Sequence, residues 1–169
     1  MSISLYDISV PAIVRGLTNL SGFLDKASAH AEAKKFDVKA LLDARLYPDM
    51  YSFLKQVQVV CDIAKGTVAR IAEVEVPKHE DNETTIAELK ARVAKTLDFV
   101  KSIKPGQIQN GEGRAIAMKF PNMTLTFTGL SYVTDFSLPN FYFHMAMAYG
   151  LLRHNGVELG KRDFIGALQ

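Results

Sequence analysis

The sequence contains no tryptophan and only one cysteine, Cys61, among its 169 residues. A single cysteine excludes an intramolecular disulfide and any metal site that needs several thiolates. No stretch approaches the roughly 20 apolar residues of a transmembrane helix, and the first residues lack the positive start and apolar run of a secretory signal. These absences predict a cytoplasmic protein that does not enter the membrane.

Charge of one sign is also not concentrated anywhere in the chain. The 20 basic and 18 acidic residues are spread along its length and give a net charge of +2. No basic block, zinc-finger pattern or helix-turn-helix signature favours nucleic acid as a partner. The composition, 48% hydrophobic and 22% charged, is ordinary for a globular protein. The length suits one domain over residues 1–169.

Apolar residues recur at steps of three and four in four long segments, which indicates amphipathic helices. The first segment is residues 4–34. Asp7 or Ser9 is expected to cap its start. Pro11 is expected in the first turn, where the missing N–H would have no helical partner.

The second helix is expected over residues 48–72. The third helix is expected to begin after a cap at Asp81 or Asn82. The third ends before Pro105, which stops it. The connection between them is polar, and His79 within it is expected to be exposed.

The periodicity changes after the third helix. Residues 114–119 and 124–128 alternate apolar and polar side chains and are bounded by turn residues, which predicts a β-hairpin. The last helix follows in two pieces, 130–136 and 139–154, with a break or kink at Leu138 because the residue before a proline disfavours the α conformation.

The chain after the last helix is expected to fold back over the bundle. Asn155-Gly156 predicts a left-handed helix end. The following Lys161, Arg162 and Asp163 are read either as surface charge that holds this tail to the bundle or as an anion-binding loop.

Three polar side chains on two helices form the candidate site. Asn140 and His144 are four residues apart and share one helix face, and Gln56 can meet them across the bundle. Amides are poor ligands for zinc or nickel, so we assign no metal and no cofactor. The trio is either a structural polar cluster, a small-molecule site or an altered metal site. No catalytic residue can be named, because no partner base or nucleophile accompanies His144 at a readable spacing.

Consecutive aromatic residues precede His144. Phe141, Tyr142 and Phe143 point in too many directions for all of them to face one core. At least one is therefore expected to face solvent, a pocket wall or a second chain, which is one reason to expect a homodimer.

Two stretches carry a resemblance to a known family. LYPDMYSFLKQVQ and LPNFYFHMAMAYGLLRHNGVELGKRDFIG resemble an uncharacterised bacterial family classed as a domain of unknown function, which is similar to the DinB/YfiT-like superfamily. The resemblance covers essentially the whole chain. It implies an all-α, four-helix bundle, here with a small β-hairpin inserted before the last helix, and a homodimer.

The resemblance also implies a departure from the superfamily's metal site. Better-known members hold a divalent metal with three histidines, and some are thiol-dependent transferases, isomerases or hydrolases. His144 takes the place of the last histidine, while Asn140 and Gln56 replace the other two. This favours a metal-free small-molecule binding or interaction protein with an interior pocket lined by Gln56, Asn140 and His144. The alternative is a metal-dependent transferase or hydrolase with an altered ligand set that includes Asp62 or another acid, so whether the protein is an enzyme stays open.

Overall fold

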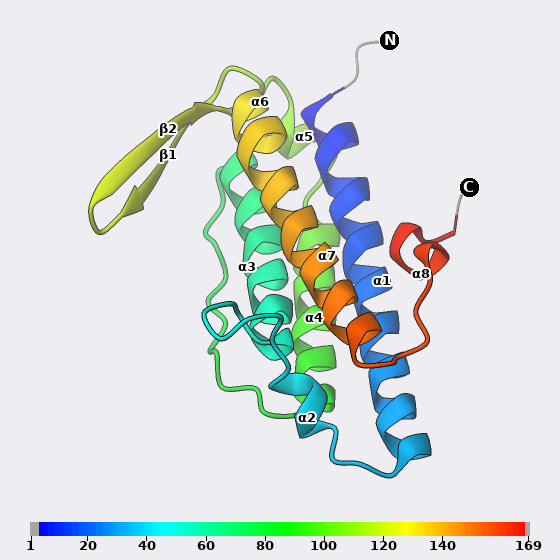
Figure 1. Ribbon diagram of the computed structural model, residues 1–169. Helices are drawn as coiled ribbons and strands as arrows, with labels where there is room; N and C mark the ends of the chain where they lie inside the picture. Colours follow the sequence, from blue (N-terminus) through cyan, green and yellow to red (C-terminus); the bar gives the residue numbers. More distant parts are fainter. Residues whose placement is uncertain (1–3, 168–169) are drawn as a thin grey trace.

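Four long helices form a bundle (Figure 1). In the computed structural model, which describes residues 4–167, they are α1 (Leu5–Lys34), α3 (Phe53–Ile71), α4 (Ile86–Ser102) and α7 (Leu138–His154). Around the bundle the order is α1, α4, α3 and α7, and α7 then contacts α1, while α1 and α3 also contact each other across the centre. The expected four-helix bundle is confirmed.

Shorter elements fill the connections. They are α2 (Lys39–Leu42), α5 (Pro105–Ile108), β1 (Ala115–Phe120), β2 (Met123–Thr128), α6 (Gly129–Ser131) and α8 (Lys161–Ile165). The segment between α3 and α4, residues 72–85, runs back along α3, so that α3 and α4 point the same way (Figure 1). None of the helices within residues 4–167 is long and apolar enough to cross a membrane.

The N-terminus of α1 is fixed by a capping box. The Ser4 hydroxyl accepts the N–H of Asp7 at 3.2 Å, and the Asp7 carboxylate accepts the N–H of Ser4 at 3.1 Å. The expected cap at Asp7 or Ser9 was therefore wrong, since Asp7 acts from the third helical position and Ser9 donates to the Leu5 carbonyl. Pro11 lies one turn further along than expected, on the exposed face of the helix.

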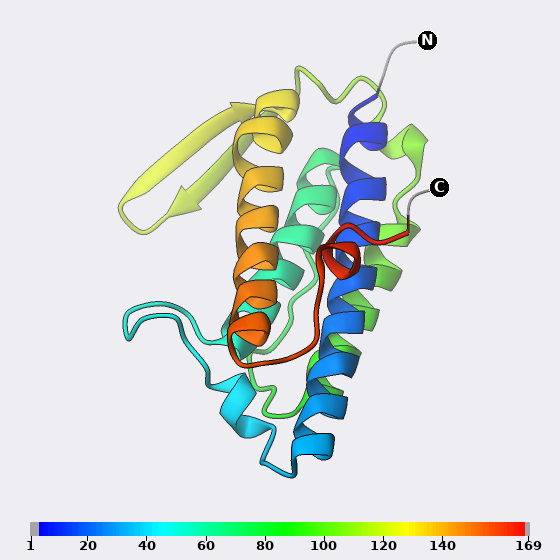
Figure 2. The ribbon, with the colours of Figure 1, turned by 45° about the vertical axis from the view of Figure 1, so that its right-hand side comes forward.

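The start of α3 also differs from expectation. The helix begins at Phe53 rather than at residue 48, because the Ser52 hydroxyl accepts the N–H of Lys55 and caps it. Residues 43–52 instead form a loop that projects from the bundle (Figure 2). The apolar rhythm alone could not separate this loop from the helix that follows it.

The cap of α4 also differs from the predicted one. Thr85, and not Asp81 or Asn82, caps the helix by accepting the N–H of Glu88 at 3.2 Å. The Glu88 carboxylate accepts the backbone N–H of Thr85 at 3.0 Å and completes a capping box. Asp81 is thereby free for an ion pair described below.

Of the break or kink expected at Leu138, the break does not occur. Leu138 is helical, with φ −65° and ψ −44°, and α6 continues into α7 through a π-helical turn at Tyr132–Ser137. A π turn is wider than an α turn, and Pro139 has no N–H to donate to the preceding turn. We attribute the wide turn to this missing donor. The helix then ends as expected, with Gly156 in the left-handed region at φ 84°.

The β-hairpin is confirmed, with β1 antiparallel to β2 and a two-residue connection. At its root, the Phe127 ring lies 5.8 Å from Tyr132 and 5.4 Å from Phe136, which attaches the hairpin to the start of the last helical segment. Its outer part extends away from the bundle (Figures 1 and 2).

Candidate functional site

The structure brings His144 of α7 against Gln56 of α3. His144 Nδ1 lies 2.7 Å from Gln56 Oε1, and both side chains are mostly buried. The Gln56 amide nitrogen donates to the Tyr51 carbonyl at 3.4 Å, which sets the orientation of the amide. Since an amide oxygen only accepts, Nδ1 carries the proton and Nε2 keeps its lone pair. Burial lowers the pKa of His144, so the imidazole is neutral at pH 7.

Aromatic rings surround this imidazole. Tyr51, in the projecting loop, is stacked on His144 with 6.3 Å between ring centroids, and Phe143 meets it edge-on at 5.1 Å. Tyr51 and Phe143 are themselves 50% and 52% exposed. His144 therefore lies at the edge of the bundle, beneath rings that solvent reaches. Tyr51 was not expected at the site, because its loop was predicted to be helical.

The other predicted residues are placed differently. Asn140 is half-buried one turn before His144, and none of the hydrogen bonds found within residues 4–167 joins its side chain to His144 or Gln56. Asp62 is bound to Lys65 and Arg92 on the α4 side of α3. Among the described residues, no three His, Cys, Asp or Glu side chains gather in a way that could hold a metal ion.

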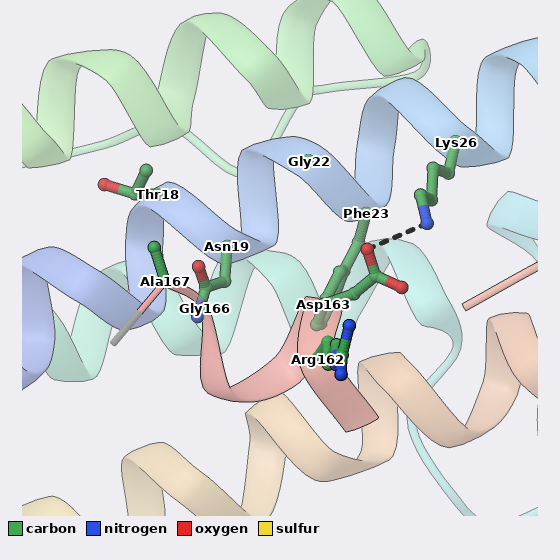
Figure 3. A pocket seen from close by; sticks show the side chains of 9 residues that line it. All are labelled: Thr18, Asn19, Gly22, Phe23, Lys26, Arg162, Asp163, Gly166 and Ala167. Atoms are coloured by element: carbon green, nitrogen blue, oxygen red, sulfur yellow. Dashed lines mark ion pairs between the residues drawn. The ribbon is translucent and has the colours of Figure 1, made fainter. Parts of the chain in front are cut away.

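A groove of about 640 Å³ lies between α1 and α8 (Figure 3). Asp163 pairs with Lys26 across it at 2.8 Å, and the Asn19 amide donates to the Phe164 carbonyl at 2.8 Å. These contacts hold the tail against α1, as one of the two sequence interpretations expected. The carboxylate of Asp163 neutralises Lys26, while the side chain of Arg162 also lines the groove.

A charged network that was not expected from the sequence lies on the face of α3 that packs against α4, away from His144. Arg92 of α4 is buried, and its guanidinium contacts Asp62 at 2.8 Å, Asp81 at 2.9 Å and Glu83 at 3.0 Å. It also donates to the Glu80 carbonyl at 3.0 Å. Three of these four partners belong to the 72–85 connection, so Arg92 holds that segment against the bundle.

Further side chains complete this Arg92 network. Lys65 pairs with Asp62 at 2.6 Å, Lys55 with Asp81 at 2.5 Å, and the Gln58 amide donates to Glu83 at 2.8 Å. Burial alone would raise the pKa of Glu83, but its hydrogen bonds from Gln58 and Arg92 outweigh burial and lower it. The hydrogen bond from Lys55 is the main cause of the lowered pKa of Asp81. The carboxylates of Asp81 and Glu83 are thus ionised at pH 7, and each is engaged by the network.

His79 belongs to the same region, and the expectation that it is exposed was wrong. Its side chain is half-buried, and both ring nitrogens are shielded from solvent without a hydrogen-bond partner among the described residues. Burial, followed by the positive charges of Lys65, Arg92 and Lys95, lowers its pKa to about 4. His79 is therefore neutral at pH 7.

One signal in the sequence could have revealed the network. Arg92 stands between Leu89 and Val93, both buried on α4, so it occupies the apolar stripe of the helix. A charged side chain at such a position is buried only when it is paired. Its partners could not be identified, because they lie on another helix and in a loop.

The arrangement of these helices defines a DinB-like four-helix bundle. The structure of a DinB family member protein from Shewanella denitrificans is similar, with a TM-score of 0.89 and 41% sequence identity over 97% of this chain and 93% of that one. The family model of DUF1993, a domain of unknown function, matches residues 5–165, and the chain belongs to this family. No curated protein matches the sequence.

Proposed function

We propose that this DinB-like protein binds a small molecule at His144 without a metal ion. The 2.7 Å contact between His144 Nδ1 and Gln56 Oε1 carries the proposal. It fixes the tautomer in which Nε2 is a hydrogen-bond acceptor, and none of the hydrogen bonds found within residues 4–167 uses Nε2. Gln56 orients the imidazole, while Asn140, on the same helix face, offers a second polar group to a ligand.

The surroundings of Nε2 indicate the chemistry of the ligand. Tyr51 and Phe143 offer exposed aromatic surface on which a planar, largely apolar molecule can stack. A neutral Nε2 accepts one hydrogen bond and carries no charge. We therefore expect a planar ligand with an N–H or O–H donor rather than an anion or a cation.

The alternative function is a metal-dependent transferase or hydrolase with an altered ligand set. One observation favours it: a histidine whose Nδ1 is bonded to a carbonyl oxygen has the orientation that metal-binding histidines commonly show. The donor set does not fit, however. Both ends of the Gln56 amide are engaged by His144 and Tyr51, and Asp62 is engaged by Lys65 and Arg92.

Three further expectations are part of the proposal. The protein acts as a homodimer, in the cytoplasm, and residues 1–169 form one domain. The exposed aromatic residues beside His144 support the homodimer, since exposed apolar patches mark interaction surfaces.

The test compares the wild-type protein with His144→Ala and with a matched control, His154→Ala, which removes an exposed histidine from the same helix. Indole and phenol serve as planar probes with one donor, and binding is followed by thermal shift and by the ¹⁵N chemical shifts of the His144 ring. We expect the probes to stabilise wild type and His154→Ala, to perturb Nε2, and to leave His144→Ala unchanged.

Two other results would contradict the proposal. If neither probe perturbs Nε2 and His144→Ala only lowers stability, the pair is a structural cluster. If zinc or nickel binds stoichiometrically by elemental analysis, and His144→Ala but not His154→Ala loses it, the metal-dependent alternative is supported instead.

A further inference from the structure

The β-hairpin of residues 115–128, here called the arm, has one wholly apolar face. Residues directly opposite each other in an antiparallel pair lie on the same face. The pairs Ile116–Phe127, Met118–Leu125 and Phe120–Met123 alternate with Ala115–Thr128, Ala117–Thr126 and Lys119–Thr124. The first set is apolar and the second is small or polar, so the arm is built to bury one side.

Only the root of that apolar face is covered within the chain. Ile116 is buried, Met118 and Leu125 are half-buried, and Phe120 and Met123 at the tip are 42% and 55% exposed. Neither tip residue joins the hydrophobic core of the described residues. An isolated two-stranded hairpin is marginally stable in water, so the tip lacks the partner that its pattern requires.

The loop of residues 43–52 projects toward the other end of the bundle, on the side to which the arm projects (Figures 1 and 2). Its exposed apolar side chains and the aromatic residue before His144 make up a second apolar surface. This loop patch is Leu46, Tyr47, Tyr51 and Phe143. Because the arm and the loop project from opposite ends of one side, a two-fold axis between two antiparallel copies can bring each arm to the other's loop.

We propose that the occupant of the arm is a second copy of this chain, and that each arm tip covers the loop patch of its partner. The proposal rests on the proposed function, because the partner's Phe120 and Met123 complete the apolar surface beside His144. Without the second copy, that surface is open to solvent on the side of Tyr51 and Phe143.

The exposed area suits such a contact. Half-exposed side chains of this size each leave on the order of 100 Å² open, so the two tip residues and the four patch residues supply roughly 600 Å² per copy. Two copies then bury roughly 1,200 Å² in total, above the roughly 1,000 Å² expected of a specific interface.

The first experiment measures mass by light scattering for wild type and two double variants at about 50 µM. Phe120→Ser/Met123→Ser changes the apolar face of the arm, and the matched control Ala117→Ser/Thr124→Ser changes the opposite face. We expect wild type and the control to be dimers and the tip variant to be a monomer with an unchanged helical circular dichroism spectrum. A monomeric wild type, or a tip variant that is still a dimer, would overturn the proposal.

The second experiment tests whether the arm tip of one copy contacts the loop patch of the other. Chains carrying Met123→Cys are mixed with chains carrying Tyr47→Cys and oxidised mildly; Cys61 is buried in both. We expect a cross-linked heterodimer well above the yield of either chain alone. An equal yield from Met123→Cys alone would place the arms against each other and contradict the arrangement.

Binding of the indole probe separates this inference from the proposed function. We expect the monomeric tip variant to bind indole at least tenfold more weakly than wild type. Equal affinity would mean that the arm does not complete the site, while binding at His144 would stand. A dimer that forms through the arm but binds neither indole nor phenol would keep the interface and refute the binding function.

Discussion

The two faces of α3 use buried polar groups in opposite ways. Toward α4 and the 72–85 connection, the Arg92 network pairs full charges with one another, although Arg92 Nε and the ring nitrogens of His79 have no hydrogen-bond partner among the described residues. Toward α7, the Gln56–His144 pair is neutral, and the hydrogen bond between its two members leaves the Nε2 acceptor of His144 unused. Paired charges hold a chain segment on one side, while a neutral pair beside half-exposed aromatic rings forms the candidate binding site on the other.

The Arg92 network has a clear task in the topology. Because α3 and α4 point the same way, the chain must return along the whole length of α3 between them. This segment, residues 72–85, includes no helix or strand. Its contacts to Arg92, Lys55 and Gln58 therefore replace the regular backbone pairing that secondary structure would supply.

The largest expected effect follows from breaking the Arg92 network at its centre. Arg92→Met keeps an unbranched apolar stem but leaves Asp62, Asp81 and Glu83 without their shared cation. Removing one partner of a buried ion pair costs about 3–5 kcal/mol, so we expect a loss of that size in the free energy of unfolding, measured in urea.

Lys90→Met is the matched control for Arg92→Met. Lys90 is on the same helix and pairs with Asp25 at the surface, and an exposed pair contributes less than about 1 kcal/mol. If the two variants lost equal stability, the distinction between the buried network and the surface charges would fail.

A smaller loss is expected on the other face of α3. Gln56→Leu removes the acceptor of His144 Nδ1 and leaves a buried donor unpaired, which costs about 1–3 kcal/mol. Replacing both partners, with Gln56→Leu and His144→Leu, should cost less than the sum of the single changes, because no polar group is then left unpaired. Additive losses in urea unfolding would show that the two side chains are not coupled.

The bundle could be predicted from the sequence because the spacing of apolar residues and the residues that end helices are local features. The hairpin and the family resemblance could also be recognised from the sequence. Helix starts were not, since Ser4, Ser52 and Thr85 each compete with neighbouring polar residues that can also cap. The choice depends on which hydroxyl meets a backbone N–H, and that is settled by the packing of the whole helix.

The site was predictable only in part for a related reason. The meeting of Gln56 and His144 follows from their positions on two apolar stripes. Tyr51 could not be placed, because it reaches the imidazole from a loop that carries a helix-like pattern. Arg92 was readable as a charge on an apolar stripe, but the carboxylates that satisfy it come from 9 to 30 residues away in the chain.

The smallest expected effect concerns pH and tests the Arg92 side again. The pKa of His79 is lowered from 6.5 to about 4, so below pH 6.5 the unfolded chain binds a proton that the folded protein does not. The titration of His79 therefore leaves the free energy of unfolding unchanged above pH 6.5 and lowers it as the pH drops toward 4. We expect His79 to contribute about 1 kcal/mol of loss between pH 6.5 and 5, after allowance for solvent screening of a half-buried group.

His79→Gln removes this titration and should flatten the fall in urea stability between pH 6.5 and 5. The fall should not vanish, because the pKa of His144 is also lowered by burial and acts with the same sign. The lowered pKa values of Asp81 and Glu83 add further loss only as the pH drops below the usual carboxylate range. His154→Gln, at an exposed position, should keep the wild-type slope. A His79→Gln slope equal to wild type would show that the imidazole is not held neutral by burial against Lys65, Arg92 and Lys95. The two faces of α3 would then respond to acid through His144 and the carboxylates alone.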